Sequence, residues 1–534
     1  MDESAPIILD TGKGLSLKYR GRFFYSSRSP VESVEKRVAA LSLDSDCLYL
    51  LPSPALGYGL VSLLKKIPSS SHVLCLEIEG PLWRIFQKHN PLKSESDLMS
   101  WTFGQTESGL LKKMMALKAW PFRRLKRIDL SGGSSLFRTA YDKWQGFLER
   151  EIQSYWKNRM TLIHMGPLWI KNLFRNLPLL EKAEDSASLH TEKPVLVVGA
   201  GPGLDSSIED LKLIRPHLFI LAVDTVLPVL MAHSIKPDAV LLLEAQAANL
   251  QDFIPQGIPD IPFIADLTSY HPLLREHKGP LYFFISRFAP WKILERLEKE
   301  GLLPRIVPAL GSVGVAALYL ARFITKKAVY FTGLDLAYTF GRSHAKGAPH
   351  DLLFHFRANR LENYSTLLFK AIYSRPLIRQ GMPGKLMELS DLILLGYADQ
   401  AREIVSSHPG IFCLSHYGIL LGANRVGPEH VREQGAFQDY FEISCQNCVA
   451  KKWNKFAIRS FLTNELRLLE EALGVAMAVM DKSLALLGAD HLKLLGEVDY
   501  VYKSFPDNAD FNEHNRAFFL RLAVALRHYI ELCR

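Results

Sequence analysis

Short apolar runs alternate with amphipathic stretches through the middle of the chain. The runs cover residues 195–198, 219–223, 239–243, 262–265, 281–285 and 328–331. Runs of this length without polar alternation are typical of strands buried on both faces of a parallel sheet, with helices between them. The pattern therefore predicts a central α/β domain with a Rossmann-like parallel sheet.

The two ends of the chain have different patterns. Apolar runs at 47–51 and 72–78 enclose a glycine turn at 57–59 and a helical stretch, which predicts a small α/β unit. Beyond residue 440, apolar residues recur at helical spacing and strand signals are almost absent, which favours a helical module.

A polar stretch at 181–193 is typical of a linker or an exposed loop. Seven Lys and Arg residues within 112–127 favour a solvated helix face, with a patch for an acidic protein or a membrane surface as the alternative. We expect an N-terminal α/β domain at 1–160, a central Rossmann-like domain at 161–440 and a C-terminal helical domain at 441–534.

Composition narrows the class of protein. The chain has 534 residues, too many for one hydrophobic core, and its 48% apolar and 22% charged residues exclude a mostly disordered or fibrous protein. Lys and Arg exceed Asp and Glu by 64 − 55 = 9, which suits an anionic ligand without requiring nucleic acid. No basic leader and no apolar run long enough to span a bilayer are visible. Six cysteines are too few for a disulfide scaffold, so we expect a cytoplasmic protein.

The strongest local motif follows the first central strand. Gly199-Ala200-Gly201-Pro202-Gly203-Leu204 leads directly into a helix, where Ser206 and Glu209 have the spacing of a capping box. Glycines allow a ligand to approach the backbone, and a helix start offers N–H groups to a phosphate. Leu204 stands where the dinucleotide fingerprint has its third glycine, and the Lys-Ser/Thr ending of a P-loop is missing.

Two further segments could complete a nucleotide site. Asp224 ends the second strand, where a carboxylate commonly faces a ribose or a base. Gly311-Ser312-Val313-Gly314 opens another helix, so Ser312 could bind a phosphate or a base. The pair Cys445 and Cys448 has the spacing of zinc ligands, but it has no second pair, which favours ordinary thiols.

A set of reactive side chains follows the strand at 328–331. It comprises Asp335, Tyr338, Arg342, His344 and Lys346. Histidine can exchange a proton near neutral pH, and the two cations could stabilise a phosphate leaving group. The carboxyl end of this strand is therefore a candidate reaction centre.

Together these motifs resemble the motility accessory factor (Maf) family of bacterial flagellin glycosyltransferases. The matching segments are 199–204, Ala-Val-Asp-Thr at 222–225, Ile-Lys-Pro-Asp at 235–238, Gly-Ser-Val-Gly at 311–314, Gly-Leu-Asp-Leu-Ala-Tyr at 333–338 and His-Ala-Lys-Gly at 344–347. The central domain of that family is similar to a group named for a 6-hydroxymethylpterin diphosphokinase (MptE-like), and its core looks like that of bacterial sialyltransferases. The family usually has serine at the position of Gly203, and Asp is common at that of Glu244.

The resemblance implies that a nonulosonic acid, pseudaminic or legionaminic acid, moves from its CMP form to Ser or Thr of flagellin and so supports flagellar assembly and motility. The implied nucleotide-binding residues are Gly199, Gly201, Pro202, Gly203, Asp224, Ser312 and Gly314. The implied catalytic residues are Asp335, Tyr338 and His344. Arg342 or Lys346 would stabilise the leaving CMP, and His344 or Asp335 would act as base in a single inverting displacement. The scheme demands no metal, although a divalent cation is compatible with it.

Three alternatives remain open. A pyrophosphokinase acting on a pterin alcohol with Mg-ATP would use Asp224, Glu244 and Asp335 as magnesium ligands, but it would not need large flanking domains. A non-catalytic flagellin-binding protein is compatible with Gly203. The third alternative, a Rossmann oxidoreductase, is disfavoured because Leu204 replaces the third glycine of the dinucleotide fingerprint.

Overall fold

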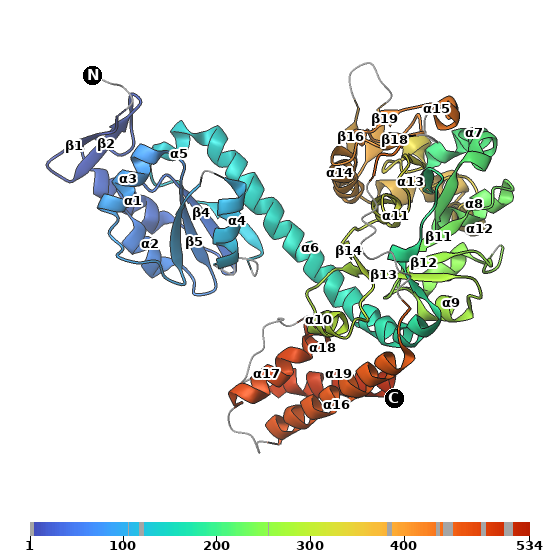
Figure 1. The fold of residues 1–534 in the computed structure, drawn as a ribbon. Helices are drawn as coiled ribbons and strands as arrows, with labels where there is room; N and C mark the ends of the chain where they lie inside the picture. The colour runs from blue at the N-terminus through green and yellow to red at the C-terminus, as the bar shows by residue number, and fades with distance from the viewer. Residues whose placement is uncertain are drawn as a thin grey trace. The chain divides into compact units, whose positions relative to one another are not determined.

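A computed structural model gives the fold of the protein (Figure 1). It describes residues 5–104, 106–116, 122–254, 256–381, 387–433, 438–441, 452–481, 487–506 and 516–534. Contacts divide the chain into two compact units, 1–161 and 162–534, and helix α6 (Arg138–Asn176) belongs to both. Among the described residues, no helix combines the length and apolarity needed to cross a bilayer.

The first unit contains a parallel sheet of four strands in the order β6-β5-β4-β7. The strands are β4 (Cys47–Pro52), β5 (His72–Glu77), β6 (Met99–Phe103) and β7 (Arg124–Arg127). The helices are α1 (Pro30–Ala40), α2 (Leu60–Lys66), α3 (Gly80–His89), α4 (Glu107–Ala116) and α5 (Gly133–Leu136). A small antiparallel sheet joins β1 (Ile7–Asp10), β2 (Leu15–Tyr19) and β3 (Arg22–Phe23). The apolar runs at 47–51 and 72–78 become β4 and β5, both fully buried.

The sequence favoured a single solvated helix face for the cationic segment at 112–127. The structure divides this segment between a helix and a strand. Lys112 and Lys113 lie on α4, whereas Arg124 to Arg127 form edge strand β7, which pairs with β4. Backbone pairing to a buried strand holds this mostly cationic segment extended, and its side chains alternate between exposed and half-buried, with Leu125 packed against a hydrophobic cluster. Asp44 forms ion pairs with Lys126 and Arg124, so part of the positive charge is neutralised. Lys118 lies outside the described residues.

The second unit is built on a large parallel sheet with the strand order β14-β13-β12-β11-β10-β9-β15-β18-β19. The strands are β8 (Glu184–Asp185), β9 (Val195–Val198), β10 (Phe219–Val223), β11 (Ala239–Leu242), β12 (Phe263–Asp266), β13 (Leu281–Arg287), β14 (Arg305–Pro308), β15 (Val329–Thr332), β18 (Ile411–Cys413) and β19 (Asn424–Arg425). The six predicted apolar runs form β9 to β13 and β15, which confirms an α/β fold around a central parallel sheet.

Helices and one small antiparallel pair complete this unit. The helices between the strands are α7 (Ile208–Ile214), α8 (Leu227–Ala232), α9 (His271–Glu276), α10 (Lys292–Lys299), α11 (Val313–Ala321), α12 (Pro349–Arg357), α13 (Tyr364–Tyr373), α14 (Leu392–Ser406) and α15 (Pro428–Glu433). Strands β16 (Ile378–Gln380) and β17 (Glu388–Ser390) pair with each other. The segment 181–193 is more than a linker, because β8 pairs with β13.

The order of the strands reverses at β9. From β9 to β14 each new strand is added on one side, and the chain then returns to place β15 on the other side of β9. In open parallel sheets, ligands bind outside the carboxyl ends of the strands at such a switch point. The turns after β9 and β15 are therefore where a ligand site is expected.

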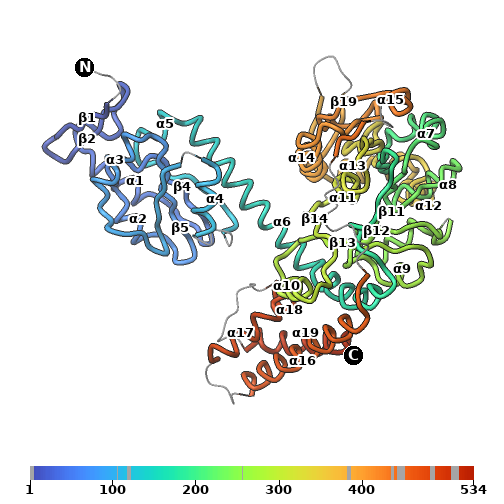
Figure 2. Tube along the Cα trace, viewed as in Figure 1, coloured from blue at the N-terminus to red at the C-terminus, as the bar shows by residue number. Residues whose placement is uncertain are grey.

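The C-terminal segment is helical throughout its described part. Its helices are α16 (Lys455–Met480), α17 (Ala489–Glu497), α18 (Asp499–Tyr502) and α19 (Arg516–Cys533), and Figure 2 shows α16, α17 and α19 gathered near α10. They share one hydrophobic core with the end of α6 and one side of the parallel sheet. The division of the central and C-terminal domains at residue 440 stays a prediction.

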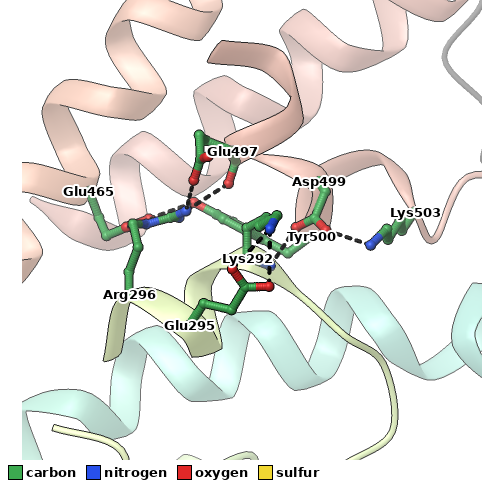
Figure 3. A network of polar contacts seen from close by, with 8 residues as sticks. All are labelled: Lys292, Glu295, Arg296, Glu465, Glu497, Asp499, Tyr500 and Lys503. Carbon is green, nitrogen blue, oxygen red and sulfur yellow. Dashed lines mark hydrogen bonds and ion pairs between the residues drawn. The ribbon is translucent and has the colours of Figure 1, made fainter. Parts of the chain in front are cut away.

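A buried ion-pair network joins α10 to these helices (Figure 3). Arg296 on α10 donates hydrogen bonds to Glu465 on α16 and, over 2.9 Å, to the carboxylate of Glu497 on α17. The Glu465 side chain is only 2% exposed and also accepts a hydrogen bond from the Tyr500 hydroxyl over 3.1 Å. Asp499 accepts a hydrogen bond from the Lys292 backbone N–H.

Replacing Arg296 with alanine is expected to destabilise the second unit by about 3–5 kcal/mol, because the Glu465 carboxylate would stay buried without its cation. Urea unfolding measures the loss. The matched control is Arg534→Ala, which removes an exposed ion pair with Glu470 and should cost under about 1 kcal/mol. Equal losses in the two variants would show that burial of Glu465 is not what makes this pair important.

Candidate active site

Two glycine turns cross each other at the switch point. The N–H of Gly199 donates to the carbonyl of Thr332 over 2.9 Å, and the N–H of Gly201 donates to the carbonyl of Gly333 over 2.7 Å. A Cβ on Gly199 would lie 2.5 Å from the Gly333 carbonyl oxygen, and Gly333 itself has a φ of 66°. This close approach of two backbones explains why both positions need glycine.

The crossing changes how the first glycine turn can act. The N–H of Gly203 also has an internal acceptor, the Asp335 carboxylate, over 2.6 Å. The amides of Gly199, Gly201 and Gly203 therefore hold the turn after β15 and are not directed at a ligand. The sequence reasoning assigned these amides to a phosphate and missed their long-range acceptors.

A cavity of about 260 Å³ opens at the carboxyl ends of β9 and β15. Six residues predicted for the site line it, namely Gly199, Gly201, Ser312, Gly314, Asp335 and His344. Its lining also includes Thr225, Glu244, Leu334, Ser343, Leu394 and Tyr397. The turn after β9, the start of α11 and the loop after β15 therefore meet at one cavity, as the motifs predicted. Six other predicted residues do not line it, namely Pro202, Gly203, Asp224, Tyr338, Arg342 and Lys346.

The start of α11 supplies the free backbone donors of the cavity. Ser312 is the N-cap residue, and its hydroxyl makes no capping hydrogen bond to its own helix. The first N–H groups of a helix have no partner within it and carry a partial positive charge. A Cβ on Gly314 would lie 2.4 Å from the Leu334 side chain, so glycine at this position avoids that contact. This helix start is the most direct anion-binding feature of the site.

Asp335 is a buried carboxylate beside the first glycine turn. It is 1% exposed, and burial raises its pKa to about 6 despite the hydrogen bond from Gly203. A Cβ on Gly203 would lie 2.9 Å from both Asp335 carboxylate oxygens. Asp335 therefore orders the turn, and glycine at 203 makes room for it.

The stability that Asp335 contributes should depend on pH. Because its pKa is raised from about 3.9 to about 6, the contribution is complete below pH 4 and is lost as the pH rises through 6. Between pH 7 and pH 4 the wild type should gain about 2–3 kcal/mol relative to Asp335→Asn. Denaturant unfolding of both proteins across this range measures the difference, with the exposed Asp399→Asn as control. A constant difference between wild type and Asp335→Asn would contradict the assignment.

His344 is the titratable nitrogen base in the cavity wall. Its ring stacks on His350 at 4.6 Å, and its Nδ1 lies 3.1 Å from the Ser343 hydroxyl. Burial, with a smaller contribution from His350, lowers the pKa of His344 to about 4. The imidazole is therefore neutral at pH 7 and can accept a proton.

Arg342 and Lys346 differ from their predicted role. The Arg342 guanidinium forms a 2.7 Å ion pair with Asp205, which also accepts the backbone N–H of Lys346 over 3.1 Å. Asp205 belongs to the first glycine turn, so these contacts fasten the loop that carries His344. The predicted stabilisation of a leaving group by Arg342 or Lys346 has no support in this geometry, because neither residue lines the cavity.

Tyr338 and Asp224 also do not line the cavity. The Tyr338 hydroxyl donates to Asp391 over 2.8 Å. Asp224 is 1% exposed, and its carboxylate accepts a hydrogen bond from the Asn249 side-chain amide over 2.7 Å. The same amide also donates to Asp252. Burial raises the pKa of Asp224. The next residue, Thr225, lines the cavity in its place.

Sequence reasoning did not find Tyr397. Tyr397 lies on α14, about sixty positions beyond Asp335. A Cβ on Gly311 would lie 2.3 Å from the Tyr397 ring. From the sequence, Glu244 was considered only as a magnesium ligand of the pyrophosphokinase alternative and as a departure from the Asp common in the family. Burial raises its pKa, with a further contribution from Asp224. A single sequence gives no signal that α14 returns to this cavity.

Metal ligands form no cluster in the part of the chain that the structure describes. No group of three or more His, Cys, Asp or Glu side chains is arranged there to hold a metal ion. Cys445 and Cys448 lie outside the described residues.

Comparisons with known proteins agree with this architecture. Residues 171–341 match the family described as 6-hydroxymethylpterin diphosphokinase MptE-like. An uncharacterised protein of Treponema pallidum (strain Nichols) is 28% identical over 562 positions, covering 99% of this chain and 95% of its own. Another uncharacterised protein of that organism is 34% identical over 153 residues, covering 27% of this chain and 39% of its own. The structure of MAf glycosyltransferase from Magnetospirillum magneticum AMB-1 aligns with a TM-score of 0.60 at 14% identity, covering 100% of this chain and 87% of that one. The chain thus contains an MptE-like domain and has the fold of a Maf glycosyltransferase, as its motifs predicted.

Proposed function

We propose that this protein is a glycosyltransferase that moves a nonulosonic acid, pseudaminic or legionaminic acid, from its CMP-activated form to Ser or Thr hydroxyls of flagellin. The observation that carries the proposal is the meeting of three motifs at one cavity. These are the glycine turn after β9, the start of α11 and the His344 loop. The fold shared with a Maf glycosyltransferase supports the same class of reaction.

The leaving group would be bound at the start of α11. CMP leaves as a phosphate monoester, so negative charge builds on its phosphate oxygens during the reaction. Ser312 and the first residues of α11 line the cavity, and the N–H groups that a helix start leaves without a partner in the helix can stabilise that charge. Arg342 and Lys346 would instead act indirectly, by holding the loop against Asp205.

His344 would be the general base. Its neutral imidazole takes the proton of the acceptor hydroxyl while the hydroxyl oxygen bonds to the anomeric carbon. In the same step the bond from that carbon to the CMP phosphate oxygen breaks, and the electron pair leaves with CMP. A single displacement of this kind inverts the anomeric configuration. Asp335 is less suited to be the base, because its carboxylate accepts the Gly203 N–H.

The pyrophosphokinase alternative has the MptE-like match in its favour. Its magnesium ligands would be Asp224, Glu244 and Asp335. The Asp224 and Asp335 carboxylates, however, accept N–H groups from Asn249 and Gly203, and Asp224 does not line the cavity. These contacts favour the transferase.

A reconstituted reaction tests the proposal. Purified protein, flagellin and a CMP-nonulosonate are expected to release CMP and to raise the flagellin mass by whole sugar residues. Consumption of ATP with a pterin alcohol, without CMP release from the sugar nucleotide, would favour the pyrophosphokinase instead. Binding of flagellin without either reaction would favour a non-catalytic accessory protein. The cytoplasmic location of the reaction is part of the proposal.

A further inference from the structure

The end of α12 and the connection from α12 to α13 carry two unusually exposed apolar side chains. Leu361 is 92% exposed and Phe356 is 84% exposed, the two highest values among the large apolar residues that the structure describes. Single exposed apolar residues are common on protein surfaces. Two such residues five positions apart, one at the end of α12 and one just after it, with two arginines between them, are a more specific feature.

The connection is an ordered turn. The Asn359 side chain accepts the backbone N–H groups of Leu361 and Glu362, over 2.9 and 3.0 Å. Glu362 forms an ion pair with Lys370 on α13. The His355 ring stacks on Tyr364 at 4.2 Å and joins the end of α12 to the start of α13. Leu361 is thus presented by a defined backbone.

The charge around these side chains is positive. Residues 355–361 contain two arginines and no Asp or Glu, and the next residue, Glu362, already pairs with Lys370. Arg357 and Arg360, beside Phe356 and Leu361, are exposed and have no ion-pair partner within the described ranges. Along the chain, these two unpaired arginines therefore lie between the two exposed apolar residues.

We infer that this turn, residues 355–361, binds the surface of an anionic phospholipid membrane. Apolar side chains that project almost fully from the surface can enter the acyl boundary of a bilayer, while neighbouring arginines remain at the negative headgroups. A protein partner of ordinary interface size would need a wide complementary surface, whereas residues 355–361 offer only two large apolar side chains. The inference does not depend on the proposed transfer reaction.

Vesicle flotation of the full-length protein tests this inference. The wild type is expected to float with vesicles of phosphatidylglycerol and phosphatidylcholine, and less with phosphatidylcholine alone. Phe356→Ser combined with Leu361→Ser should weaken binding about tenfold or more. Arg357→Gln combined with Arg360→Gln should weaken binding to the anionic vesicles and reduce its salt dependence. The control is Phe456→Ser, a 78% exposed residue elsewhere, which should bind like the wild type.

Two results would overturn the inference. One is a wild type that does not float with anionic vesicles. The other is a double serine variant that floats as well as the wild type. If the wild type does not bind vesicles and the double serine variant loses binding to flagellin, the turn binds a protein and the inference of membrane binding is wrong. Because the assay needs no sugar nucleotide, its failure is distinct from failure of the transferase proposal.

Discussion

Gly333→Ala is expected to destabilise the second unit by about 3 kcal/mol or more, whereas Gly341→Ala should cost only about 1 kcal/mol. The two glycines have nearly the same backbone conformation, with φ of 66° and 68°. They differ in their surroundings. A Cβ on Gly333 would lie 2.3 Å from the carbonyl oxygen of Gly199, whereas a Cβ on Gly341 would meet nothing within 4 Å.

The difference arises because the atom in the way belongs to the backbone. A flexible side chain could move aside, but the Gly199 carbonyl is part of the turn that ends β9, which Thr332 and Gly333 hold by hydrogen bonds. Separating the two turns would also release the Gly201 N–H from its acceptor. The Gly333 variant should therefore lose sugar-nucleotide binding as well as stability.

Denaturant unfolding measures the loss of stability, and hydrogen exchange followed in the segment 199–204 of the intact protein measures the separation of the two turns. We expect faster exchange at the Gly201 amide in Gly333→Ala and wild-type exchange in Gly341→Ala. If the two variants lose the same amount of stability, backbone strain alone explains the cost, and the close crossing of the turns has no special role.

His344→Ala is expected to lower the rate of sugar transfer by about 10²- to 10⁴-fold, with the fold intact. The change removes the nitrogen base of the cavity wall while leaving the start of α11 unchanged. Sugar-nucleotide binding should therefore stay close to the wild-type value, and the loss should appear in kcat. The matched control is His350→Ala, which removes the stacked but more exposed neighbour and should retain most of the activity.

The pH profile gives a second readout of the same residue. Because burial lowers the pKa of His344 to about 4, the neutral form dominates down to about pH 5. The value of kcat/KM, which reports the free enzyme, should hold its plateau well below the usual histidine pKa of about 6.5. An acid limb near 6.5, or an equal loss in His350→Ala, would contradict the assignment of His344 as the base.

The strands of the central sheet could be predicted because burial on both faces leaves a clear pattern. The runs at 195–198 and 219–223 match β9 and β10 residue for residue. Strands β8 and β7 could not be predicted in this way. Glu184–Asp185 and Arg124–Arg127 are mostly charged segments held extended by backbone pairing with a buried neighbour, and such pairing leaves no hydrophobic signature.

The site was predictable to the level of its turns but not of its side chains. Glycine and serine at helix starts marked the turn after β9 and the start of α11, because their backbone requirements are local. Which of Asp224 and Thr225 faces the cavity depends on how the chain leaves β10, and Arg342 is held by Asp205, more than 130 positions away. Contacts of that kind are set by the tertiary fold.

We propose that the cavity at the carboxyl ends of β9 and β15 transfers an acidic sugar to flagellin with His344 as base. Intact-mass analysis of flagellin tests it most directly, in cells that carry the gene, lack it, or carry only His344→Ala. We expect flagellin to lose mass by whole nonulosonate residues when the gene is absent, and the wild-type gene but not His344→Ala to restore the mass. Identical flagellin masses in all of these cells would contradict the account.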